Sequence, residues 1–184
     1  MRSHTDLPER RPDMAHTPSR PFDIRDAALS DASALAELLN AIIDRGGTTA
    51  HEDRFTPERL TDSYLTGRAF LCCFVAVDRA TGRIEGFQTL GRYPELPENI
   101  GDIGTFARND GKQRGVGSAL FVATCGRARR LSLSAINATI RADNVGGLAF
   151  YRKMGFEDHS TTRAVPLKDG RLVDRVNRRF RLTP

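Results

Sequence analysis

Residues 111–121, GKQRGVGSALF, hold three glycines and two cations within seven residues and then run directly into an apolar segment. Glycine weakens the interior of a helix or strand, so such a cluster marks backbone that turns sharply or comes close to another group. The pattern predicts a strand before the cluster, at 100–107, a helix after it, at 115–130, and a second strand at 131–140. Because a helix connects these two strands, we expect them to be parallel.

This position makes the glycine cluster a candidate anion site. The first N–H groups of a helix have no acceptor within it, and the helix dipole is positive there, which favours a phosphate. Lys112 and Arg114 would add positive charge. The cluster has neither the residue order of a Walker loop nor the third glycine of a dinucleotide fingerprint. Taken alone, it leaves two alternatives open: a phosphate site, or a tight turn that begins a helix.

The rest of the chain predicts an α/β (α+β) fold with one mixed sheet and helices on both faces. An apolar run followed by a turn and a return segment predicts an antiparallel pair, and Asp31 or Ser30 can cap the first helix. The further elements that we expect are strands at 22–27, 69–78 and 83–93, helices at 31–45, 56–67 and 144–155, and a final hairpin over 156–182.

The length of 184 residues suits one domain, residues 22–184, after a polar tail, residues 1–21, that we expect to be disordered. No apolar run is long enough to cross a bilayer, and the N-terminus lacks the apolar core of a secretory signal. These features predict a cytoplasmic protein with no membrane partner. Cys72, Cys73 and Cys125 lack the spacing of a zinc site, so we interpret them as buried thiols and expect no metal.

The net charge of +5 comes from the C-terminal end, because residues 163–184 contain seven Arg and Lys against two Asp. An anionic ligand or a solvated face explains such a cluster more often than nucleic acid does, so nucleic acid is not the expected partner. An exposed C-terminal strand could also serve a homodimer.

A second motif lies in RADNVGGLAFYRKMGF, residues 141–156, where Asn144 and Tyr151 stand two helical turns apart on one face. Together, this motif and KQRGVGSALF resemble the GNAT superfamily of acyl-CoA-dependent N-acetyltransferases, which has a Q/R-x-x-G-x-G/A pyrophosphate loop and a downstream Asn and Tyr. The resemblance covers residues 22–165. One departure is Lys112, where the family usually has Gln or Arg. Residues 40–60 are similar to the phosphinothricin and methionine sulfone acetyltransferase branch.

The resemblance implies a mostly antiparallel GNAT-like sheet of six to seven strands with one splayed parallel pair. It also implies acetyl-CoA as the co-substrate, with its phosphates at the glycine cluster and its pantetheine arm paired along a strand. The residues implied in cofactor binding are Thr105, Phe106, Ala107, Lys112, Gln113, Arg114, Gly115, Val116, Gly117, Ser118 and Asn144.

The resemblance further implies direct acetyl transfer, within a ternary complex, to a primary amine of a small, amino-acid-like molecule. Asp102 is the candidate base, acting through a water, since the branch has the longer Glu at the matching position. Tyr151 is the candidate acid for the CoA thiolate, because a phenol can donate a proton to a thiolate. The candidate acceptor-binding residues are Thr49, His51, Arg92 and Tyr93.

Three alternative hypotheses about the function stay open. The acceptor could be a protein N-terminus or a charged tRNA. The docking face would then consist of Arg175, Arg178, Arg179 and Arg181. The chain could instead be a non-catalytic acyl-CoA sensor, or a nucleotide-binding module that takes ATP or NAD and ignores CoA.

Overall fold

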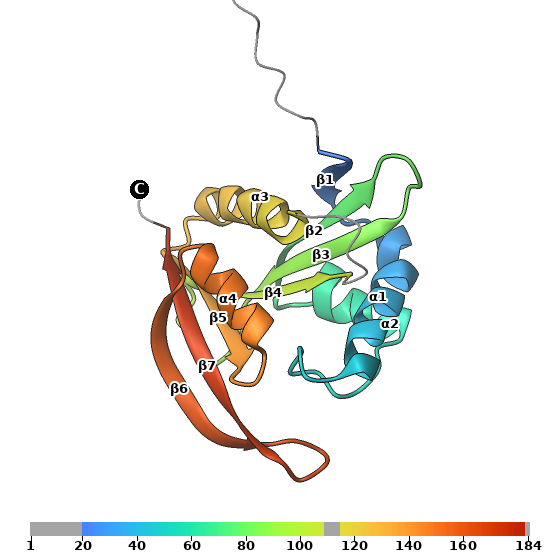
Figure 1. The fold of residues 1–184 in the computed structure, drawn as a ribbon. Coiled ribbons are helices and arrows are strands. Elements are labelled where there is room, and N and C mark those ends of the chain that lie inside the picture. The colour runs from blue at the N-terminus through green and yellow to red at the C-terminus, as the bar shows by residue number, and fades with distance from the viewer. Residues whose placement is uncertain (1–19, 109–114, 183–184) are drawn as a thin grey trace, which may run out of the picture.

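The computed structural model describes residues 20–108 and 115–182. Within them, seven strands form one sheet in the order β1-β2-β3-β4-β5-β7-β6 (Figure 1). The strands are β1 (Phe22–Asp26), β2 (Phe70–Asp78), β3 (Ile84–Gly91), β4 (Ile100–Ala107), β5 (Ala135–Arg141), β6 (Glu157–Pro166) and β7 (Leu172–Arg181). The helices are α1 (Ala32–Arg45), α2 (Pro57–Thr61), α3 (Val116–Arg130) and α4 (Val145–Lys153). The predicted tail, 1–21, lies outside the described residues except for its last two.

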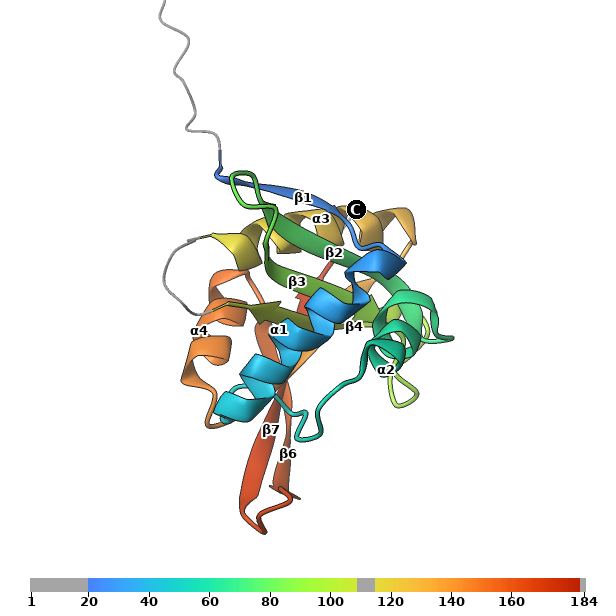
Figure 2. The same ribbon diagram turned by 90° about the vertical axis from the view of Figure 1, so that its right-hand side faces the viewer.

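Two hydrophobic clusters lie on opposite faces of the sheet. α1 and α2 cover one face, where Leu35 and Leu60 pack with Phe87 of β3. α3 and α4 cover the other face, where Leu120 and Tyr151 belong to the same cluster. Figure 2 shows α1 in front of β2, β3 and β4, with α3 behind them. Within the described ranges, no helix has both the length and the apolar character that a bilayer crossing requires.

The adjacent cysteines of β2 confirm the strand assignment. Cys72 belongs to the cluster under α3 and Cys73 to the cluster under α1, as the alternation of side chains along a strand requires. Both are buried free thiols, as is Cys125. Burial raises the pKa of Cys72 and Cys125 to about 11, so these thiols stay protonated at neutral pH.

β4 and β5 form the parallel pair, and every other ladder of the sheet is antiparallel. Their ladder has three residue pairs and ends at Asp102↔Asn137. Beyond this point β4 continues beside β3 alone, to Ala107, and β5 continues beside β7 alone, to Arg141. The sheet therefore opens between its two central strands, and the predicted fold class is confirmed.

Two local predictions near helix ends are wrong. The strand predicted at 131–140 begins only at Ala135, because the chain first makes a turn in which Ser132 has a φ of 56°. Asp31 does not cap α1. Its carboxylate instead accepts hydrogen bonds from the Ala28 N–H at 2.8 Å and from the Arg25 guanidinium at 2.7 and 2.9 Å.

The C-terminal strand is not an exposed edge, because β7 lies between β5 and β6. Arg175 and Arg178 are only 8% and 4% exposed, so the prediction that they belong to an open docking face is wrong. Arg178 donates to Asp158 at 2.6 Å, and Arg179 donates to Asn137 at 2.9 Å. Of the four arginines named for docking, only Arg181 is exposed.

Candidate active site

A cavity of about 910 Å³ occupies the opening between β4 and β5. It extends from the first turn of α3 and the start of α4 to the loop between α1 and α2. Most of the residues predicted for the site line this one cavity, although they come from five separate segments. They are Thr49, His51, Arg92, Tyr93, Asp102, Thr105, Phe106, Ala107, Gly115, Gly117, Ser118, Asn144 and Tyr151.

Of the predicted residues that the structure describes, Val116 alone is not part of this lining. Lys112, Gln113 and Arg114 lie outside the described residues. Val116 is 5% exposed and packs in the core beneath α3, which makes its side chain a structural one.

Two different structural constraints explain the glycines at the start of α3. Gly115 precedes the helix with a φ of +86°, a left-handed conformation that side chains disfavour. Gly117 is helical, but a Cβ there would lie 2.9 Å from the ring of Phe150 in α4. The Ala119 N–H donates to the Gly115 carbonyl oxygen at 3.0 Å, which closes the first turn of α3. The first N–H groups of a helix have no acceptor within the helix, so the start of α3 is a place where a phosphate can bind.

Asp102 stands at the last paired position of the parallel ladder, where the opening begins. Its Oδ1 accepts a hydrogen bond from Asn137 Nδ2 at 2.7 Å, and Arg179 Nε in turn donates to Asn137 Oδ1. Burial raises the pKa of Asp102 to about 6, while Asn137 and the charge of Arg179 oppose this rise. A carboxylate with this pKa can both hold and release a proton near neutral pH.

Tyr151 reaches the same cavity from the other face of the sheet. Its hydroxyl lies 3.0 Å from Thr105 Oγ1. Thr105 follows Ile103 on the α3 side of β4, whereas Asp102 shares the α1 side with Phe106. Burial raises the pKa of Tyr151 and the nearby Asp102 adds to this, while hydrogen bonds from Thr105 oppose it, so the phenol keeps its proton. The cavity thus has a carboxylate on one face and a neutral phenol on the other.

Asn144 lines the cavity and also holds local structure. Its Oδ1 accepts from the Gly147 N–H at 2.8 Å, which caps α4, and its Nδ2 donates to the Thr48 carbonyl at 2.8 Å. The residue therefore joins the helix that carries Tyr151 to the loop that carries Thr49 and His51.

The α1–α2 loop closes the far end of the cavity with an aromatic group. His51 Nε2 lies 2.6 Å from Tyr64 Oη, and the His51 ring contacts Phe55 and Phe106. Burial lowers the pKa of His51, and the charge of Arg59 adds to this effect, which favours a neutral imidazole. Arg92 and Tyr93 line the cavity just after β3, and Arg92 donates to the Glu98 backbone carbonyl.

Sequence reasoning missed several polar residues of the site. Arg141 lines the cavity, is 5% exposed and is held by Asp143 through bonds of 2.8 and 2.6 Å. Tyr64 and Asn137 were also missed, since their roles depend on neighbours from other strands and loops. The described part of the chain has no group of three His, Cys, Asp or Glu side chains placed to hold a metal ion.

Comparison with known proteins agrees with this geometry. The chain matches the model of the acetyltransferase (GNAT) family over residues 36–156. It is 28% identical over 167 residues to the L-methionine sulfoximine/L-methionine sulfone acetyltransferases of Pseudomonas paraeruginosa and Pseudomonas aeruginosa, covering 88% of this chain and 95% of each relative.

Solved structures share the fold. An N-acetyltransferase from Staphylococcus aureus superposes with a TM-score of 0.77 at 18% identity, covering 88% of this chain and 99% of that one. A phosphinothricin acetyltransferase from Sinorhizobium meliloti, solved with acetyl-CoA, has a TM-score of 0.73 at 20% identity, covering 88% of each chain. The family and branch that the motifs predict are confirmed. This protein therefore belongs to the GNAT family and is an acyl-CoA-dependent N-acetyltransferase.

Proposed function

We propose that this enzyme transfers an acetyl group from acetyl-CoA to the primary amine of a small, amino-acid-like molecule. The observation that carries the proposal is the pair formed by Asp102 and Tyr151, which reach one cavity from opposite faces of the sheet at the point where β4 and β5 separate. The two Pseudomonas relatives are named as acetyltransferases of L-methionine sulfoximine and L-methionine sulfone, and these names support an acceptor of this class.

In the proposed reaction, Asp102 removes a proton from the acceptor ammonium, directly or through a water. The free amine attacks the thioester carbonyl carbon, and the C–S bond of the resulting intermediate breaks. Tyr151 gives its proton to the departing thiolate, and its phenolate then takes the second proton from the new amide nitrogen. The acceptor loses two protons in total, of which one ends on CoA and one leaves through Asp102.

The first turn of α3 is the proposed site for the CoA pyrophosphate, because Gly115, Gly117 and Ser118 line the cavity there and the first N–H groups of a helix have no acceptor within it. We propose that the pantetheine arm pairs with β4 at Thr105, Phe106 and Ala107. This part of β4 pairs with β3 along one edge, and no described strand of the sheet pairs with its other edge. We assign Thr49 and His51 to the acceptor end, because their loop closes the cavity on the face that carries Asp102.

An acceptor screen tests the proposal. CoA thiol release from acetyl-CoA would be measured with L-methionine sulfone, L-methionine sulfoximine and phosphinothricin, each beside its N-acetylated form. A peptide that begins with alanine and bulk aminoacyl-tRNA would represent macromolecular acceptors. We expect release with at least one free amino acid, none with its blocked form, and less with the macromolecules. Release with the peptide or the tRNA alone would overturn the small-molecule assignment.

A further inference from the structure

A buried glutamine continues the hydrogen-bond chain that reaches Tyr151. Gln88 lies opposite Thr105 in the β3–β4 ladder and has no exposed surface. Its Nε2 donates to Thr105 Oγ1 at 2.8 Å, and Thr105 Oγ1 lies 3.0 Å from Tyr151 Oη. Gln88 Oε1 is buried and has no hydrogen-bond partner among the described residues. The reaction proposed above gives no role to Gln88 or to the Thr105 hydroxyl.

The orientation of the Gln88 amide decides the direction of this chain. With nitrogen toward Thr105, one of the two amide N–H groups is bonded, and the carbonyl oxygen has no partner among the described residues. Rotating the amide by half a turn would break the donation to Thr105 and move the nitrogen, with both its N–H groups, to the position that now has no hydrogen-bond partner among the described residues. An orphaned buried N–H is rarer than an under-satisfied carbonyl oxygen. The amide therefore donates to Thr105.

The Thr105 hydroxyl can then donate to Tyr151, which leaves the Tyr151 hydrogen free to point elsewhere. The Thr105 hydroxyl has one hydrogen, and Gln88 already donates to its oxygen. When the Thr105 hydrogen points to Tyr151 Oη, the Tyr151 hydrogen has to point away from Thr105. Both Thr105 and Tyr151 line the cavity, so the phenol hydrogen can then point toward the opening between β4 and β5.

We propose that Gln88 and Thr105 are positioning residues, which hold the Tyr151 O–H directed at the departing thiolate and make it more acidic. This inference rests on the proposed function, in which Tyr151 is the acid. Hydrogen bonds in a chain polarise one another, and donation to a phenol oxygen favours the phenolate. The chain thus opposes the rise that burial causes in the pKa of Tyr151.

Thr105→Val and Thr105→Ser form a matched pair, because valine keeps the shape of threonine and serine keeps its hydroxyl. We expect Thr105→Val to lower kcat by about five- to tenfold, the effect of one hydrogen bond to the phenol, with the KM for acetyl-CoA nearly unchanged. Thr105→Ser should stay within about twofold of the parent enzyme. Gln88→Met should also lower kcat, by a smaller factor than Thr105→Val does.

A double-mutant cycle separates positioning from packing. In a Tyr151→Phe background, Thr105→Val should have no further effect on kcat, because the group that it serves is gone. Equal losses in both backgrounds, or a Thr105→Ser enzyme as slow as Thr105→Val, would overturn the positioning role. An unchanged kcat in Tyr151→Phe alone would instead remove the acid role from the proposed function. Failure of the inference is thus distinguished from failure of the proposal beneath it.

Discussion

Asp102 shows how a strand position determines the chemistry of a side chain. On an exposed strand face a carboxyl group titrates near 4. Here the residue stands where the parallel ladder ends, so it is covered by the sheet yet borders the cavity. Burial raises its pKa to about 6, and Asn137 and Arg179 limit the rise. The same contacts that hold the carboxylate in place therefore bring it into the range of a general base.

The pH dependence of kcat/KM tests this assignment. Because the base acts when ionised, activity should rise with pH through a limb centred at about 6 and then level off. Asn137→Ala removes a donor that lowers the pKa of Asp102, so it should move the limb upward by about one unit. An unmoved limb in Asn137→Ala, or the same limb in Asp102→Asn, would exclude Asp102 as its source.

The stability of the protein should also depend on the protonation of Asp102. The pKa of Asp102 is higher in the folded chain than its ordinary value of 3.8, so the folded state binds more protons between about pH 4 and pH 6. This contribution to stability is present at low pH and is lost as pH rises through about 6. Asp102→Asn should therefore raise Tm by about 2–6 °C at pH 7.5 but not at pH 4. Calorimetric scans at the two pH values measure this difference, and an equal change at both would contradict it.

The first turn of α3 offers a matched pair of glycines at the scale of one element. Gly115→Ala meets no atom of the described residues within 4 Å but has to adopt a φ of +86°, which should lower stability by about 1 kcal/mol. Gly117→Ala has no such strain but pushes the Phe150 ring, which lines the cavity. We expect the Gly117 variant to lose several-fold in acetyl-CoA affinity, measured by calorimetry, and Phe150→Leu to restore part of it. If Gly117→Ala alone binds acetyl-CoA normally, the Phe150 ring moves aside without changing the cavity, and this prediction is wrong.

The elements themselves follow closely from the sequence. The glycines of 111–117, the Asn144 and Tyr151 spacing, and the apolar run of β2 are local patterns, and they predicted the helices, the strands and the parallel connection. The strand that follows α3 was predicted to begin too early in the sequence. Leu131 and Leu133 are apolar, and this property does not distinguish a turn from a strand. Register and strand order are not local. Asn137 becomes a neighbour of Asp102, and Gln88 of Thr105, only when the ladders are known.

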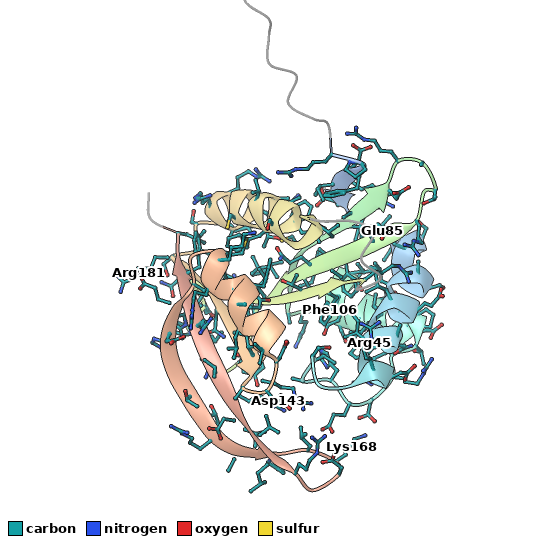
Figure 3. All side chains as sticks on the ribbon, viewed as in Figure 1. Arg45, Glu85, Phe106, Asp143, Lys168 and Arg181 are labelled. Carbon is teal, nitrogen blue, oxygen red and sulfur yellow. The ribbon has the colours of Figure 1, made fainter. Side chains whose placement is uncertain are left out.

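At the scale of the whole molecule, strand order explains the basic C-terminal segment. With β7 inside the sheet, Arg178 and Arg179 serve internal hydrogen bonds. The hairpin tip also contacts the α1–α2 loop, since the Lys168 backbone N–H donates to the Glu52 carboxylate and the Lys168 ammonium bonds Asp53 (Figure 3). The C-terminal hairpin thus meets the N-terminal half of the chain beside the loop that borders the cavity.

The most direct test of the central claim is CoA thiol release by the parent enzyme, Asp102→Asn and Tyr151→Phe, with acetyl-CoA affinity measured on the same samples. We expect all three proteins to bind acetyl-CoA about equally, and the two variants to release thiol about a hundredfold more slowly. Variants that bind and turn over like the parent would place the chemistry elsewhere. A parent enzyme that binds acetyl-CoA but releases no thiol with any amine would identify a sensor and contradict the account.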